Sequence, residues 1–219
     1  MMETKEIRNT NRYPVTVTDD EIVCYAAFHE SFDRLFEGED KTYADIFTEG
    51  VKKHWGEAGF KVSIIRVGPD DKRPHIKVLP AKLTNTSYVM SRWWRWGWGL
   101  FTHAFHPESF MLNWSKRNPG NIHMNLRNNF SVPRFMRVSA HEFGHVLGLG
   151  DAYAAHYRFY FEAPGTEDYM MNRNVKVSQR EKEMVYAAQR TGRMQYFPMK
   201  ISPRTYFKGI SENIKKKRK

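Results

Sequence analysis

Apolar residues recur along the chain at two different spacings, which separate helices from strands. Within residues 41–60 they repeat at intervals of three and four, the spacing of one helix face. The apolar residues of this repeat are Tyr43, Ile46, Phe47, Val51 and Trp55. The pattern predicts a helix that stops at Gly56 or Gly59.

Strands are predicted on both sides of that helix. Residues 21–32 begin as an apolar strand and continue into a less regular segment. Residues 61–67 alternate strongly, and a short strand at 75–80 follows the turn-forming stretch 68–74. The first half of the chain is therefore predicted to run strand, helix, strand, strand.

The second half contains one further strand and two helices. Residues 121–130 alternate apolar and polar side chains, as a half-buried strand does. Residues 131–150 are predicted to form a helix closed by glycines. A last helix begins after Ser178, where Glu181 three residues later completes a capping box. Between these halves, the aromatic-rich stretch 88–114 ends in a strand-like segment, 109–114.

These elements define an α+β protein with a single domain. We expect a twisted mixed sheet with an early helix, a second helix after the last strand and a C-terminal helix. The domain is predicted to span residues 20–195. Residues 1–19 are predicted to be a flexible N-terminal leader, and residues 196–219 a C-terminal extension with a basic tail.

Composition narrows the class of protein. The 219 residues are 41% hydrophobic, enough for one large core, and the one cysteine, Cys24, allows no disulfide within the chain. No signal-peptide stretch and no run of about 18 apolar residues is present, so we expect a cytoplasmic protein without a transmembrane segment, with export by another route as the alternative. The net charge is +11, and the last five residues supply five of these positive charges. Such a block of like charges favours a solvated tail over a binding site for an anionic partner.

The segment HEFGHVLGLGD, residues 141–151, carries the candidate chemistry. His141 and His145 lie four residues apart, so on a helix both rings share one face, the arrangement in which two imidazoles bind one zinc ion. Glu142 adjoins the first histidine and is placed to act as a general base on a water molecule. The sequence therefore predicts one catalytic zinc ion.

A catalytic zinc ion usually has three protein ligands. Gly148 allows the backbone to turn after the helix, and Asp151 then returns a carboxylate to the ion. Asp151 is the preferred third ligand, because Pro164 and Gly165 indicate a loop around the competing glutamates. The alternatives are Glu162, Glu167 and His156.

The motif resembles the zinc-binding helix of the metzincin metallopeptidases, and its aspartate is similar to that of the snapalysin-like members. The resemblance implies a metzincin-like domain with zinc ligands His141, His145 and Asp151 and with Glu142 as general base. It also implies a methionine turn beneath the metal, at Met171 or alternatively Met170. Several metzincins have a tyrosine two residues after this methionine, where Arg173 stands here.

The resemblance further implies that a substrate peptide pairs with an edge strand next to the site. The strand before the motif helix is expected to fill this role, with Ile122, His123 and Met124 as substrate-binding residues. Residues 91–114 are a second candidate for a substrate pocket, although tryptophan clusters more often form core.

These expectations combine into one functional hypothesis. The chain is predicted to be a monomeric zinc-dependent endopeptidase that hydrolyses peptide bonds with a zinc-activated water. Its expected partner is a peptide or protein substrate, and no nucleic acid. Two alternatives stay open: a catalytically inactive domain of the same fold that binds peptides or anionic surfaces, and an amidase for a non-protein substrate.

Overall fold

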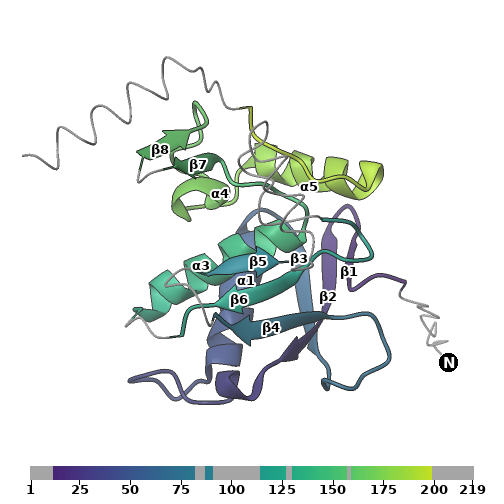
Figure 1. Cartoon of the computed structure of the whole chain (residues 1–219), viewed down its shortest axis with the longest axis vertical. Helices are drawn as coiled ribbons and strands as arrows, with labels where there is room; N and C mark the ends of the chain where they lie inside the picture. Colours follow the sequence, from purple (N-terminus) through teal and green to yellow (C-terminus); the bar gives the residue numbers. More distant parts are fainter. Residues whose placement is uncertain (1–11, 82–86, 91–113, 127–129, 157–158, 199–219) are drawn as a thin grey trace, which may run out of the picture.

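The fold is a mixed α+β single domain with a curled sheet and a few helices (Figure 1). The computed structural model describes residues 12–81, 87–90, 114–126, 130–156 and 159–198. The strands of the main sheet are β1 (Val15–Val17), β2 (Glu21–Phe28), β3 (Lys61–Arg66), β4 (Ile76–Pro80), β5 (Tyr88–Met90) and β6 (Asn121–Met124). The remaining elements are η1 (Glu30–Phe32), α1 (Tyr43–Glu57), α3 (Val132–Val146), β7 (Tyr153–His156), β8 (Phe159–Glu162), α4 (Met170–Arg173) and α5 (Gln179–Thr191).

Parallel strands form the centre of the main sheet. β2 pairs with β3 on one side, and with β1 and then β4 along its other side. β4 pairs with β6, and β5 lies beside β6 as the last strand in the order of the sheet. In this sheet only β1 and β5 run antiparallel to the strands they pair with. The predicted strands at 21–32, 61–67, 75–80 and 121–130 are therefore confirmed, with shorter bounds.

Four strands were not predicted, namely β1, β5, β7 and β8, and β1 corrects the expected leader. β1 lies inside residues 1–19, where Val15 pairs with Cys24 and Val17 with Ile22 after a tight turn closed by the Thr18 amide on the Glu21 carbonyl. β5 is only three residues long, and its register is set by residues more than 30 positions away. Such short strands depend on partners that periodicity in one segment does not reveal.

β6 is an interior strand, contrary to the expectation that it forms the sheet edge. Val78 of β4 flanks Ile122 on one side, and Val89 of β5 flanks it on the other. The main chain of β6 is thus paired on both sides at this position, which leaves no free side there for a substrate strand. Within the described ranges, β5 is the outermost strand at this end of the sheet.

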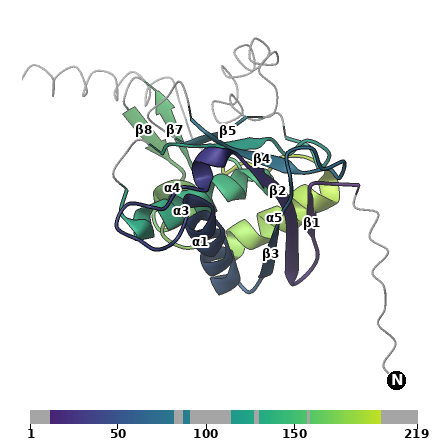
Figure 2. The same cartoon turned by 90° about the horizontal axis from the view of Figure 1, so that it is seen from below.

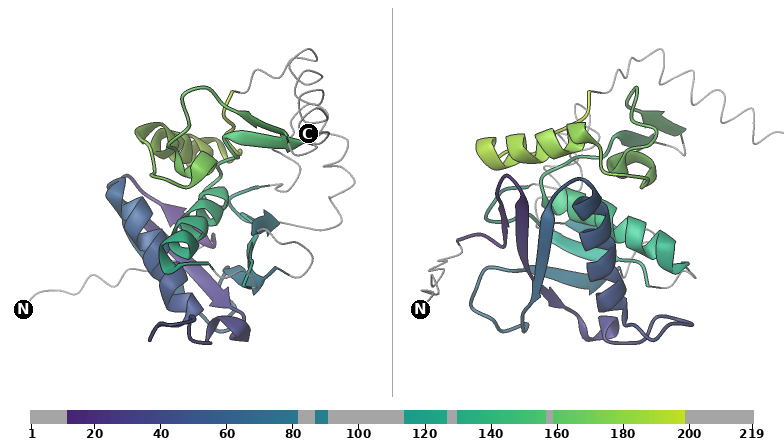
Figure 3. Two further views of the ribbon diagram at one scale, coloured as in Figure 1. Left: turned by 90° about the vertical axis from the view of Figure 1, so that its left-hand side faces the viewer. Right: turned by 180° about the vertical axis from the view of Figure 1, so that it is seen from behind.

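α1 and α3 lie side by side over one face of the sheet (Figures 2 and 3). α1 starts at a capping box between Thr42 and Asp45, and Gly59 takes a positive φ of 88° just after its end. The indole of Trp55 is fully buried and donates a hydrogen bond to the Ala140 carbonyl of α3 at 3.0 Å. The predicted helices at 41–60 and 131–150 are thereby confirmed.

The C-terminal elements pack against the other side of α3. In Figures 1 and 3 the β7–β8 hairpin, α4 and α5 lie across α3 from β6. α5 begins at the predicted capping box of Ser178 and Glu181. Glu162 ends β8, so it lies in a strand and not in the expected loop.

The fold continues past residue 195, where the sequence analysis placed the start of the extension. Gln195 forms a parallel bridge with Leu149, and Phe197 is 2% exposed in the core. Residues 199–219, with the basic tail, and the expected strand at 109–113 lie outside the described residues. Among the described helices, none combines the length and the apolar character needed to cross a bilayer.

Candidate metal centre

The motif begins on α3 and ends in a turn that requires glycine. Leu147 caps the helix, and Gly148 follows with a φ of 99°. A Cβ added at Gly148 would lie 2.8 Å from the Ala188 Cβ and 3.0 Å from the Trp114 ring. Both conformation and space therefore exclude a larger residue. The chain reverses here and brings Asp151 back toward the helix.

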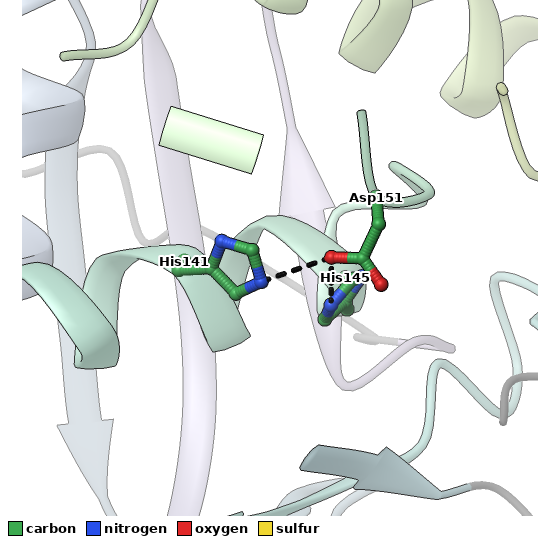
Figure 4. A group of neighbouring side chains, drawn as sticks. All are labelled: His141, His145 and Asp151. Atoms are coloured by element: carbon green, nitrogen blue, oxygen red, sulfur yellow. Dashed lines mark ion pairs between the residues drawn. The ribbon is translucent and has the colours of Figure 1, made fainter. Parts of the chain in front are cut away.

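His141, His145 and Asp151 come together at this reversal (Figure 4). Asp151 Oδ1 lies 3.1 Å from His141 Nε2 and 3.5 Å from His145 Nε2. The two imidazole rings are perpendicular, with centroids 5.0 Å apart. The structure thus brings the three residues proposed as ligands into one cluster.

Main-chain carbonyls orient both imidazoles. His141 Nδ1 lies 2.8 Å from the Met170 carbonyl oxygen, and His145 Nδ1 lies 2.8 Å from the Leu149 carbonyl oxygen. A carbonyl only accepts hydrogen bonds, so each Nδ1 carries a proton, and the neutral form of each ring then has its lone pair at Nε2. Histidine ligands of zinc typically donate a hydrogen bond from their other ring nitrogen in this way.

The donor atoms fit a zinc ion. Ligands of a tetrahedral zinc at about 2.0–2.1 Å lie roughly 3.3 Å from one another, close to the two Nε2–Oδ1 distances above. Asp151 Oδ1 is buried and faces the Nε2 atoms of both imidazoles. With both rings neutral, these three atoms are all acceptors and repel one another, and a divalent cation between them relieves that repulsion. In the described part of the chain no other group of three such ligands occurs.

Glu142 is enclosed beside these residues. Glu142 is only 4% exposed, and its Oε2 has no hydrogen-bond partner within the described structure. Burial raises the pKa of Glu142 to about 8; the charge of Asp151 adds to the rise, and His141 opposes it. A carboxylate with a pKa near neutrality can both accept and return a proton.

The charges of the cluster are strongly coupled in the metal-free protein. Burial would lower the pKa of His141, but the carboxylate of Asp151 outweighs it and raises this pKa to about 9. Burial lowers the pKa of His145, while Asp151 partly opposes the shift. Burial acts to raise the pKa of Asp151, yet the two imidazoles hold it below its ordinary value. In the metal-free site, the carboxylate of Asp151 therefore favours the protonated form of His141.

The methionine turn contributes one side chain and one carbonyl. A Cβ added at Gly144, between the two histidines, would collide with the sulfur of Met171, so this methionine packs directly on the motif helix. Met170 supplies the carbonyl that orients His141. Both side chains are fully buried. Met171 therefore contacts the motif helix with its side chain, whereas Met170 contacts His141 through its carbonyl.

Of the other candidate ligands, Glu162 and Glu167 do not belong to the cluster. The carboxylate of Glu162 accepts hydrogen bonds from the guanidinium of Arg173, at 3.0 Å to its Nη2. Glu167 is exposed, and the side chain of His156 lies outside the described structure. Arg173 is turned toward Glu162 at the position where several metzincins have tyrosine.

The expected substrate residues do not line the site. Ile122 and Met124 are fully buried in the core. His123 points to the opposite face of the sheet, where its ring stacks on Tyr88 with centroids 4.6 Å apart. The substrate-binding assignment of these three residues is therefore corrected.

Two residues near the site were missed by the sequence analysis. The ring of Tyr153 lies roughly parallel to that of His141, with centroids 6.4 Å apart, and only its position two residues after Asp151 points to it. Gln195 contacts the turn through its main chain. Its main-chain N–H donates to the Gly148 carbonyl, and its main-chain carbonyl accepts from the Gly150 N–H, both at 2.8 Å. No sequence signal marks Gln195.

Comparisons with protein-family models, with curated proteins and with solved structures found no match to this chain.

Proposed function

We propose that this protein is a zinc-dependent endopeptidase of the metzincin-like type. The observation that carries the proposal is the convergence of His141 Nε2, His145 Nε2 and the Asp151 carboxylate beside the buried Glu142. Two imidazoles and one carboxylate form a known ligand set of hydrolytic zinc sites.

The order of elements supports the metzincin-like assignment. The early helix α1 follows β2, and the motif helix α3 follows β6. The expected methionine turn then packs against α3, and α5 is the last helix of the described chain. These are the features that the motif resemblance implies for the rest of the chain.

Each residue of the cluster has a distinct task in the proposed reaction. His141, His145 and Asp151 would hold the zinc ion through Nε2, Nε2 and a carboxylate oxygen. When bound, zinc would supply Lewis acidity for a water molecule and for the scissile carbonyl. Glu142 accepts the proton of the attacking water on its carboxylate and returns it to the leaving amine. In the metal-free chain, burial raises the pKa of Glu142 to about 8, so its carboxylate binds a proton more readily than an exposed glutamate does.

The outer side of β5 is the place for an extended substrate in this proposal. Tyr88–Met90 pairs with β6 on one side only within the described ranges, and β5 and β6 both pack near α3. Pairing with the free side of β5 would hold a peptide by its main chain, with little demand on its sequence. This replaces β6 as the expected substrate strand.

The test is hydrolysis of casein and of a peptide library by the zinc-loaded chain and by Glu142→Gln. We expect the wild type to cleave, to lose cleavage with a chelator and to regain it with zinc. Glu142→Gln should retain zinc but lose about 10²- to 10⁴-fold in rate, because it lacks the proton acceptor. Glu167→Gln is the matched control, since Glu167 is an exposed glutamate, and it should cleave at the wild-type rate.

The outcomes separate the alternatives. Cleavage by Glu142→Gln near the wild-type rate would show that another group is the base. A wild-type chain that binds zinc but cleaves no peptide would favour the inactive binding domain or an amidase for a non-protein substrate.

A further inference from the structure

We propose that Glu181 is a positioning residue for His141, acting through the methionine turn. The inference rests on the zinc site of the proposed function and assigns Glu181 a second task beside its place in the capping box of α5. Its side chain is fully buried, which is rare for a carboxylate that serves only as a helix cap.

The two oxygens of Glu181 bind different segments. Oε2 accepts a hydrogen bond from the Ser178 amide at 2.6 Å, which is the capping box predicted from the sequence. Oε1 accepts from the Met171 amide at 2.7 Å. One carboxylate therefore joins the start of α5 to the methionine turn.

The segment held by Glu181 touches the candidate zinc site at three places. The Met170 carbonyl accepts the hydrogen bond that orients His141. The Met171 sulfur packs against Gly144 between the two histidines. The Met171 carbonyl accepts from the amide of Ala152, directly after Asp151, at 2.8 Å. Fixing the Met171 amide thus constrains the surroundings of both His141 and Asp151.

The chemistry of Glu181 favours a role beyond capping. An exposed residue at this position would complete the capping box without a desolvation cost, as Asp45 does at the partly exposed start of α1. Burial of the Glu181 carboxylate disfavours its charged form, which is a cost that an exposed cap does not have. The buried hydrogen bond from the Met171 amide offsets part of this cost, because a charged acceptor forms stronger hydrogen bonds than a neutral one.

The test compares Glu181→Ala with Ser178→Ala in the full chain, using zinc affinity measured by competition with a chromophoric chelator. Both substitutions disrupt the capping box, but only Glu181→Ala removes the acceptor of the Met171 amide. We expect Glu181→Ala to weaken zinc binding by about tenfold, which is the smallest loss of affinity typical of residues that support metal ligands without binding the metal. Ser178→Ala should weaken it by less than about twofold. Glu181→Gln should fall between them, because its amide oxygen can accept only one of the two N–H groups.

Hydrogen exchange in the metal-free chain gives a second readout that does not depend on activity. The Met171 and Ala152 amides should exchange faster in Glu181→Ala than in Ser178→Ala, because only the first frees the turn. If Glu181→Ala does not fold, Glu181→Gln takes its place in the same comparison with Ser178→Ala.

The inference and the proposed function fail in different ways. Equal zinc affinities in Glu181→Ala and Ser178→Ala, or unchanged exchange of the two amides, would reduce Glu181 to a helix cap and overturn the inference. A wild-type chain that binds zinc but hydrolyses no peptide would overturn the proposed function alone. A chain that takes up no zinc would overturn both.

Discussion

The two flanks of α3 hold this helix in different ways. On the flank of α1 and the sheet, the buried contacts are mainly apolar, as at Phe135 and Ile122, and the Trp55 indole adds a hydrogen bond to the Ala140 carbonyl. On the flank of α4, α5 and Gln195, the contacts nearest the site are directional hydrogen bonds to the carbonyls of Met170 and Leu149 and around the Gly148 turn.

This difference separates stability from metal binding. Apolar burial contributes most of the free energy of folding but is non-directional, so it does not fix the orientation of a ring. Hydrogen bonds contribute less free energy each but do fix orientation. We therefore expect substitutions on the sheet flank to lower stability, and substitutions on the C-terminal flank to lower zinc affinity.

The largest effect is expected on the sheet flank, from Phe135→Ala. The Phe135 ring packs edge-on to Phe36 and Tyr43, six residues before His141 on α3. Its loss should lower the free energy of unfolding by about 3–5 kcal/mol, measured by urea denaturation, while the zinc affinity of the folded protein stays within about twofold. Leu35→Ala, at a side chain 62% exposed, is the control and should change stability by less than about 0.5 kcal/mol. A large loss of zinc affinity in Phe135→Ala would contradict the separation.

Gly148→Ala should affect both properties, because Gly148 lies where the two flanks meet. The positive φ and the contacts with Ala188 and Trp114 together should cost about 2–4 kcal/mol of stability. Zinc affinity should fall as well, since the turn carries Asp151. Gly165→Ala is the matched control: its φ is also positive, at 74°, but nothing lies within 4 Å of an added Cβ. Equal losses of stability at the two positions would show that the contacts of Gly148 with Ala188 and Trp114 do not contribute to the effect.

Zinc affinity should depend on pH through the proton between His141 and Asp151. The pKa of His141 is about 9 in the metal-free site, so zinc must displace a proton below that pH. Affinity should fall about tenfold for each unit of pH below 9, and calorimetry in buffers of different ionisation enthalpy should detect about one released proton at pH 7. Because this pKa is raised in the fold, its contribution to the stability of the metal-free chain is complete below the ordinary value and is lost as pH rises through 9. Affinity that is constant between pH 7 and 9 would contradict the coupling.

The smallest effect is expected from Arg173→Ala. Arg173 follows the methionine turn but pairs with Glu162 at the surface, and such pairs contribute at most about 1 kcal/mol. Zinc affinity and hydrolysis should both stay within about twofold of the wild type. A loss of rate of tenfold or more would show that Arg173 assists the reaction from the position that tyrosine has in several metzincins.

Much of the fold could be predicted from local patterns. The apolar repeat of 41–60 gave α1, and Ser178 with Glu181 gave the start of α5. The spacing of the motif also predicted that Asp151 returns to the two histidines, because a helix face and a glycine turn are local geometry.

Contacts between distant segments could not be predicted in this way. β5 is set by its pairing with β6, and the carbonyl that orients His141 lies 29 residues away. A carbonyl is present at every residue, so no side-chain pattern shows which one is used. The same holds for Gln195, whose contacts with the turn are made by its main chain.

The most direct test of the central claim is a crystal structure of the zinc-loaded protein with anomalous data at the zinc edge. We expect one anomalous peak at about 2.0–2.2 Å from His141 Nε2, His145 Nε2 and Asp151 Oδ1. A peak bound by other residues, or no peak between these three side chains in zinc-loaded crystals, would contradict the account.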